Sequence, residues 1–159
     1  LTDARKQVGA VSSPTRSLFF GGETPSITNI IDFVTTSTLG NAQDFSDLNV
    51  TRSGAGGVSS STRAVMVNGS APSSSNTMDF VTMATKGNAI DFGDQTKACA
   101  LAAHASDSIR GVRMAGVGSG VDGEMAYINI ATQGDAVFFG DLTNFHIEGA
   151  GCSNGHGGL

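Results

Sequence analysis

Gly87-Asn88-Ala89-Ile90-Asp91-Phe92-Gly93-Asp94 is the stretch from which the fold can be inferred, because the same eight-residue pattern occurs three times. An earlier copy begins at Gly40 and a later one at Gly134. The spacing is constant, since 87 − 40 = 47 and 134 − 87 = 47. A fixed period of about 20 to 50 residues indicates a repeat architecture, in which one unit cannot bury its apolar face alone.

Extending this register outward gives three repeats that align without a gap, over residues 12–58, 59–105 and 106–152. Residues 1–11 match the end of a preceding repeat and residues 153–159 the start of a fourth, so we expect the chain to be a segment of a longer polypeptide. Some residues are identical in all three repeats, and we interpret them as what one unit needs to fold and stack. They are Ser12/Ser59/Ser106, Arg16/Arg63/Arg110, Gly22/Gly69/Gly116, Thr38/Thr85/Thr132, Gly40/Gly87/Gly134, Ala42/Ala89/Ala136, Phe45/Phe92/Phe139 and Asp47/Asp94/Asp141.

Each repeat contains four short stretches with strand character, separated by turn residues. Around the second repeat these are 63–68, 77–85 and 89–96, followed by the innermost strand of the next unit at 100–106. No segment of useful length has a helical period. Four antiparallel strands in 40 to 50 residues are typical of a β-propeller blade, so the sequence predicts an all-β fold.

The repeat resembles the kelch repeat. In kelch repeats an apolar strand ends in Gly-Gly, as Phe19-Phe20-Gly21-Gly22 does here, and an Arg precedes the small-residue innermost strand of the next blade, as Arg52 precedes 53–58. The kelch Tyr and Trp are absent, replaced by Phe33/Phe80/Tyr127 and by the eight-residue block. In these substitutions the chain is similar to kelch-like repeat proteins of tailed bacteriophages. That resemblance implies a virion location and a structural role in a tail fibre or another appendage involved in host attachment.

Composition agrees with such a location. Charged residues are only 14% of the chain, and Ser, Thr and Asn supply the polarity, which suits an extracellular or virion β-protein. The net charge of −5 and the lack of any Lys or Arg run make nucleic-acid binding unexpected. No stretch of 18 apolar residues predicts a membrane span.

We expect neither enzymatic activity nor a cofactor. His104, His146 and His156 lie at unrelated registers, so no metal site is predicted, and the recurring Asp residues fit structural roles better than catalysis. An enzyme similar to galactose oxidase would need Tyr and His copper ligands, and the chain has a single tyrosine, Tyr127. The main alternative is an extracellular bacterial kelch-like module that binds a glycan or a protein.

Structural roles are expected for three sets of recurring residues. Arg16, Arg63 and Arg110 should hydrogen-bond to the block aspartates Asp47, Asp94 and Asp141, because charge-assisted pairs would satisfy half-buried groups. Phe45, Phe92 and Phe139 should pack between units. Cys99 and Cys152 lie six registers apart, roughly 20 Å along a strand, so we expect free, buried thiols and no disulfide.

Binding, if present, is expected at the connection between the second and third strands, which varies most between repeats. These connections are 23–28, 70–75 and 117–123, with Glu23, Thr24, Ser70, Ser74, Val117, Ser119 and Asp122 as the candidate residues. Three blades leave apolar faces open, so further repeats of the polypeptide or other copies of the chain are expected partners. Other virion proteins and a host surface glycan or protein complete the expected set.

Overall fold

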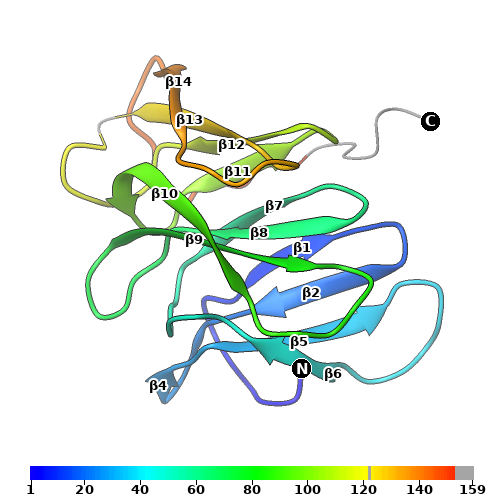
Figure 1. The fold of residues 1–159 in the computed structure, drawn as a ribbon. Helices are drawn as coiled ribbons and strands as arrows, with labels where there is room; N and C mark the ends of the chain where they lie inside the picture. Colours follow the sequence, from blue (N-terminus) through cyan, green and yellow to red (C-terminus); the bar gives the residue numbers. More distant parts are fainter. Residues whose placement is uncertain (122, 153–159) are drawn as a thin grey trace.

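The computed structural model describes residues 1–121 and 123–152, and every regular element among them is a β-strand (Figure 1). The strands form three four-stranded antiparallel sheets and one small hairpin. The all-β class and the four strands per repeat are therefore confirmed. Among the described residues, no helix has the length and apolar character of a membrane span.

Sheet 1 has the order β1-β2-β5-β6, with strands β1 (Gly9–Ser12), β2 (Arg16–Phe20), β5 (Ile30–Thr35) and β6 (Gln43–Asp47). The short strands β3 (Glu23–Thr24) and β4 (Ser26–Ile27) form the small hairpin between β2 and β5.

Sheet 2 repeats this arrangement with β7 (Gly56–Ser59), β8 (Arg63–Val67), β9 (Ser75–Thr82) and β10 (Ile90–Cys99). Sheet 3 repeats it again with β11 (Ala103–Ser106), β12 (Arg110–Met114), β13 (Glu124–Asn129) and β14 (Val137–Asp141). The repeat boundaries chosen from sequence thus fall at the end of each innermost strand.

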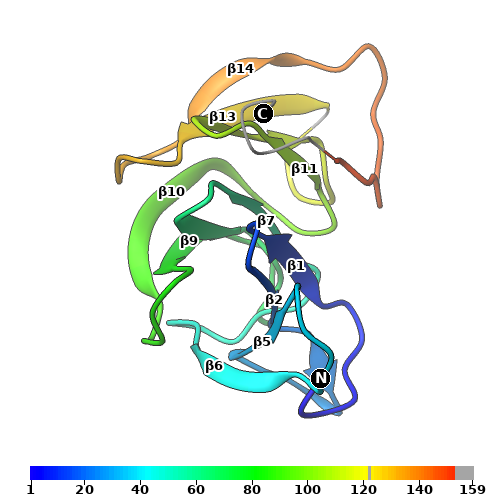
Figure 2. The same cartoon turned by 90° about the vertical axis from the view of Figure 1, so that its right-hand side faces the viewer.

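The sheets stack face to face, with the innermost strands β1, β7 and β11 next to one another. Figure 2 shows the outer strands β6, β10 and β14 spread farther apart around this side of the molecule. We call the side of a sheet that meets the following sheet its forward face, and the opposite side its rear face.

The core consists of one forward face packed on the next rear face. Between sheets 1 and 2 the forward face supplies Val11, Leu18, Phe20, Ile31, Phe33 and Phe45, and the rear face supplies Ala55, Met66, Val81, Met83 and Ala89. Between sheets 2 and 3 the same registers return, displaced by 47 residues: Val58, Val65, Val67, Met78, Phe80 and Phe92 against Ile128, Ile130 and Ala136. One interface is therefore used twice.

A β-bulge explains why the phenylalanine of the block turns into this interface. In sheet 1, Asp44 pairs with Asp32 and Ser46 pairs with Ile31, so Phe45 is the extra residue between them. The register shifts in sheets 2 and 3 leave Phe92 and Phe139 in the same position. A bulge reorients a side chain locally, and each ring here meets the aromatic ring of the neighbouring strand edge to face, with centroids 5.8, 5.9 and 6.0 Å apart.

The expected packing of these rings between units is confirmed for two of them. Phe45 and Phe92 are each 2% exposed, whereas Phe139 is 50% exposed because no described sheet covers the forward face of sheet 3.

The expected pairing of the recurring arginines with the block aspartates is wrong. Arg16 and Arg63 instead stack on Phe33 and Phe80, at 5.0 and 4.5 Å from the ring centroids. Arg16 donates to the carbonyl of Met83 at 2.8 Å and Arg63 to that of Ile130 at 2.9 Å, both in the following sheet. A planar guanidinium can satisfy an aromatic face and carbonyl acceptors together, so it needs no carboxylate.

Arg110 stacks in the same way on Tyr127, at 4.9 Å. The carboxylates of Asp47, Asp94 and Asp141 are on exposed residues. The main chain of these aspartates instead helps to join successive sheets. The carbonyls of Asp47 and Asp94 accept hydrogen bonds from the N–H groups of Ala89 and Ala136 at 2.9 and 2.8 Å.

Both cysteines are free thiols in the structure, but only Cys99 is buried. Burial raises the pKa of the Cys99 thiol. Cys152 is exposed, which corrects the expectation that both would be buried.

Candidate functional site

The three variable connections between second and third strands emerge along one side of the stacked sheets, on the left in Figure 1. Backbone hydrogen bonds place them next to one another. The N–H of Arg52 donates to Thr28 O at 3.0 Å, and Ser53 and Ser70 exchange both backbone bonds, at 3.0 and 2.8 Å. The first connection is thereby joined to the second through the segment at 52–53.

The second connection contacts the third directly. The hydroxyl of Ser74 donates to the carbonyl of Val117 at 3.3 Å. Val117 also exchanges two backbone hydrogen bonds with Ala100, at 2.9 and 2.7 Å. The three connections therefore form one continuous polar edge, which we call the connection edge.

The candidate residues of this edge differ in exposure. Val117 and Ser119 are exposed, whereas Thr24, Ser70 and Ser74 are half-buried. Glu23 is half-buried and forms an ion pair with Lys6 at 2.7 Å, so its charge is already partly matched within the chain. Asp122 lies outside the described residues.

A buried arginine clamps the base of each connection. In sheet 1, Arg5 Nη1 donates to the carbonyls of Gly21 and Ile30, both at 2.9 Å, and its Nη2 pairs with Asp32 Oδ2 at 2.5 Å. Gly21 and Ile30 are the residues at which the first connection leaves β2 and enters β5. The guanidinium thus joins the two ends of the connection to a strand carboxylate.

Sheet 2 has the same clamp at the same registers, one repeat later. Arg52 Nη1 donates to Asn68 O at 3.2 Å and to Thr77 O at 3.0 Å, and its Nη2 pairs with Asp79 Oδ2 at 2.5 Å. The side chains of Arg52 and Asp79 are 1% and 0% exposed. Burial raises the pKa of Asp79 and lowers that of Arg52, while their mutual attraction opposes both shifts.

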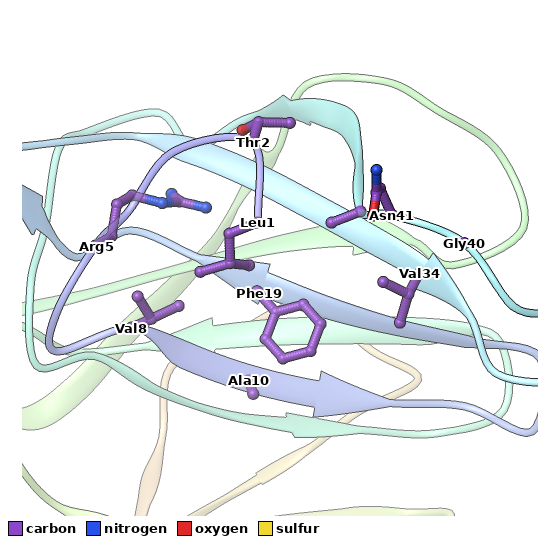
Figure 3. A pocket seen from close by; sticks show the side chains of 10 residues that line it. Leu1, Thr2, Arg5, Val8, Ala10, Phe19, Val34, Gly40 and Asn41 are labelled. Atoms are coloured by element: carbon purple, nitrogen blue, oxygen red, sulfur yellow. The ribbon is translucent and has the colours of Figure 1, made fainter.

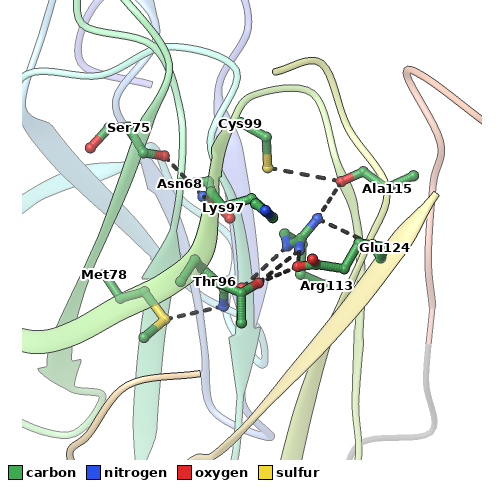
Figure 4. Close-up of polar contacts among 10 residues, drawn as sticks. Asn68, Ser75, Met78, Thr96, Lys97, Cys99, Arg113, Ala115 and Glu124 are labelled. Carbon is green, nitrogen blue, oxygen red and sulfur yellow. Dashed lines mark hydrogen bonds and ion pairs between the residues drawn. The ribbon is translucent and has the colours of Figure 1, made fainter. Parts of the chain in front are cut away.

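Sheet 3 keeps the clamp but builds it from other positions, as Figure 4 shows. The register of Arg52 holds Cys99, and the register of Asp79 holds Ala126. Arg113, on β12, reaches the equivalent carbonyls instead and donates to Ala115 O at 2.8 Å and Glu124 O at 3.2 Å.

The carboxylate in sheet 3 comes from Glu124, which pairs with Arg113 Nη2 at 2.8 Å. Gln95 Oε1 accepts from Arg113 Nε at 3.2 Å, so the relocated guanidinium is also held by sheet 2. A charged clamp at this point is thus present in all three sheets although its residues are not. The clamp residues were not predicted because they are not identical in all three repeats. Arg5/Arg52 and Asp32/Asp79 are identical in two repeats, and that partial identity could have indicated the clamp.

The histidines do not assemble into a site. His104 is buried on β11 next to Gly56, where a β-carbon would collide with the imidazole ring, and His146 is exposed. His156 lies outside the described residues. Within residues 1–121 and 123–152, no group of three or more His, Cys, Asp or Glu side chains is placed to hold a metal ion.

His104 should make stability depend on pH. Burial, aided by the charge of Arg113, lowers the pKa of its imidazole from 6.5 to about 4. Because the unfolded chain takes up this proton first, the free energy of unfolding should fall as the pH drops from about 6.5 to about 4. We expect a loss of about 2 kcal/mol between pH 7 and pH 5 from this group, measured by urea unfolding. His104→Gln should remove that part of the slope, and an unchanged slope would contradict the assignment.

The chain matches no protein-family model, and no curated protein sequence is significantly similar to it. The functional argument therefore depends on the geometry above.

Proposed function

We propose that this chain is a structural protein of a tailed-bacteriophage virion, built from kelch-like propeller blades in a tail fibre or appendage. Its connection edge would contact a glycan or protein of the host surface, and it would carry no enzymatic activity or cofactor. The observation that carries the proposal is the contrast between the residues that are identical in all three repeats and the residues of the three connections. Most of the recurring residues act in stacking the sheets, while the connections differ in sequence and share one side.

The clamps support this division of labour. A buried ion pair with several hydrogen bonds fixes the two ends of each connection, and it does so even in sheet 3, where its residues have changed. Divergent loops on rigid bases are the usual arrangement of binding surfaces on repeat scaffolds. The virion location is proposed from the resemblance of the repeat sequence to kelch-like phage repeats alone, and recovery of the chain from purified particles would test that location.

Making the three connections identical tests the role of the edge. We expect that replacing 23–28 and 117–123 by the sequence of 70–75 will abolish attachment of the particle to its host. The circular dichroism spectrum should show that the fold is retained. Attachment at the original level would leave the connections as spacers and remove the binding role.

A matched control makes the opposite ends of the second strands identical. The turns at 13–15 and 107–109 are replaced by the Ser-Ser-Thr of 60–62. This variant changes two turns on the other side of the sheets and should attach normally. Loss of attachment in the control would show that the assay reports assembly, not recognition.

A further inference from the structure

The hairpins that join the third and fourth strands of sheets 1 and 2 each enclose a small hollow. The hollow in sheet 1 has a volume of about 70 Å³ and the hollow in sheet 2 about 150 Å³. Both hairpins emerge on the side of the molecule opposite the connection edge, on the right in Figure 1. They are therefore separate from the surface already proposed to bind.

The two hollows are lined from the same eight registers, and six of these registers carry the same residue in both sheets. By comparison, the first two repeats as a whole share 20 of 47 residues. The lining is thus better kept than the repeat around it. The shared residues are Phe33/Phe80, Val34/Val81, Thr35/Thr82, Thr38/Thr85, Gly40/Gly87 and Asn41/Asn88.

Stacking of the sheets accounts for the apolar members of this set but not for the polar ones. Phe33 belongs to the core between sheets 1 and 2. Thr38 and Asn41 are exposed, as are their counterparts in sheet 2. At Gly40 no described atom lies within 4 Å of the place that a β-carbon would take, so the rim of the hollow is open to an incoming molecule.

Main-chain groups border the hollows as well. The last pair of the ladder in sheet 1 joins Phe33 to Gln43, and the next in phase would join Thr35 to Asn41. Both of these residues line the hollow instead, so the strands part and leave backbone hydrogen-bonding groups facing it. Val34, Gly40 and Asn41 are labelled in Figure 3, where they also border a wider hollow on the rear face of sheet 1.

Sheet 3 does not keep these free polar groups. Asn129 stands at the register of Thr35 and Asp135 at that of Asn41. The side chain of Asn129 accepts from the N–H of Ala131, and that of Asp135 from the N–H of Asp94, both at 3.0 Å. The equivalent side chains in sheet 3 are thus already used within the chain.

The groups that the two hollows share are uncharged. Lys86 borders only the second hollow, because its register in sheet 1 holds Leu39. A carboxylate or phosphate would call for cationic partners in both hollows, whereas threonine hydroxyl, asparagine amide and backbone groups donate to and accept from hydroxyl groups. Each volume is below the range of about 300–1,000 Å³ that encloses a drug-sized ligand, so a hollow can hold one edge of a small polyhydroxylated molecule.

We infer that the hairpins at 33–43 and 80–90 each bind one uncharged sugar unit. Each site is shallow, so its affinity is weak and a glycan gains by occupying both. The inference is independent of the virion location and of the connection edge, because exchange of 23–28 and 117–123 leaves both hairpins intact.

Amide NMR spectra of the isotope-labelled 159-residue chain test the inference directly. The probes are D-glucose, D-galactose, D-mannose and N-acetyl-D-glucosamine. At least one of them should shift the signals of Gly40, Asn41, Gly87 and Asn88, with a dissociation constant of about 1–10 mM, and leave Asp135 unchanged. No shift with any of the four sugars would overturn the inference. Equal shifts with glycerol, or shifts with D-glucuronate alone, would overturn it as well.

Variants locate each site. Asn88→Ala should raise the dissociation constant in sheet 2 at least about 10-fold and leave sheet 1 unchanged, since one lost hydrogen bond in a polar site has about that effect. Asn41→Ala should do the reverse. The control is Ser37→Ala, on the same hairpin as Asn41, because the register of Ser37 in sheet 2 already holds Ala84. Weakening by Ser37→Ala to the same extent, or unchanged binding in both asparagine variants, would contradict the assignment.

Discussion

Replacing Arg52 by Cys should lower the free energy of unfolding by about 3–5 kcal/mol, because the carboxylate of Asp79 would be left buried without its partner. Asp79 is wholly buried, and without Arg52 its side chain would keep hydrogen bonds from Asn49, whose side-chain amide lies at 3.0 Å, but no positive charge. The carbonyls of Asn68 and Thr77 would lose their donor as well. Chemical unfolding at pH 7 measures the change.

The double variant Arg52→Cys, Asp79→Ala is the matched control, because it recreates the residues of sheet 3 at these registers, Cys99 and Ala126. It removes both charges, so it should be more stable than Arg52→Cys alone. A double variant as unstable as the sum of the two single ones would show that the pair is not coupled in the way that its 2.5 Å contact implies.

The stacked sheets could be predicted from the sequence because periodicity survives divergence. Four strand signals per 47 residues, an apolar strand ending in glycine and a phenylalanine beside small residues determine which faces are apolar and how they repeat. The observed strands Arg63–Val67, Ser75–Thr82 and Ile90–Cys99 begin and end within three residues of the expected ranges 63–68, 77–85 and 89–96. Local pattern was sufficient here because each strand pairs with its neighbour in sequence.

The partners of the charged residues could not be predicted in the same way. Arg16 and Arg63 recur together with the block aspartates, but recurrence within a chain does not show which recurring groups meet. The structure joins each arginine to a carbonyl 67 residues away and leaves the aspartates exposed. Pairing across sheets depends on how the faces stack, which no local pattern specifies.

The clamp could not be recognised from residues shared by all three repeats, because in sheet 3 its arginine lies at a different register. Arg113 comes from a second strand, whereas Arg52 comes from the segment before an innermost strand, yet both guanidinium groups donate to carbonyls at the same two registers. A search for identical residues finds only sequence positions that are kept in every repeat. Here the position changes, and what is kept is a guanidinium group beside the same two carbonyls. Comparing pairs of repeats, and asking where a lost charge is replaced, would have found it.

Truncating Phe92 to Ala should cost about 3–5 kcal/mol of unfolding free energy, since a large cavity would open between sheets 2 and 3. The ring is 2% exposed and meets Phe80 edge to face at 5.9 Å. It belongs to the cluster that includes Ile128 and Ile130 of the following sheet.

Ile90→Ala is the control for this prediction, because Ile90 lies two residues earlier on the same strand and is 58% exposed. That substitution should change the free energy of unfolding by no more than about 0.5–1 kcal/mol. Equal losses for the two variants would mean that β10 as a whole is sensitive to truncation and that the bulge does not direct Phe92 into the interface. A large loss for Phe92 alone would place the stability of the stack in the contact between sheets, because the hydrogen bonds within sheet 2 are untouched by removal of the ring.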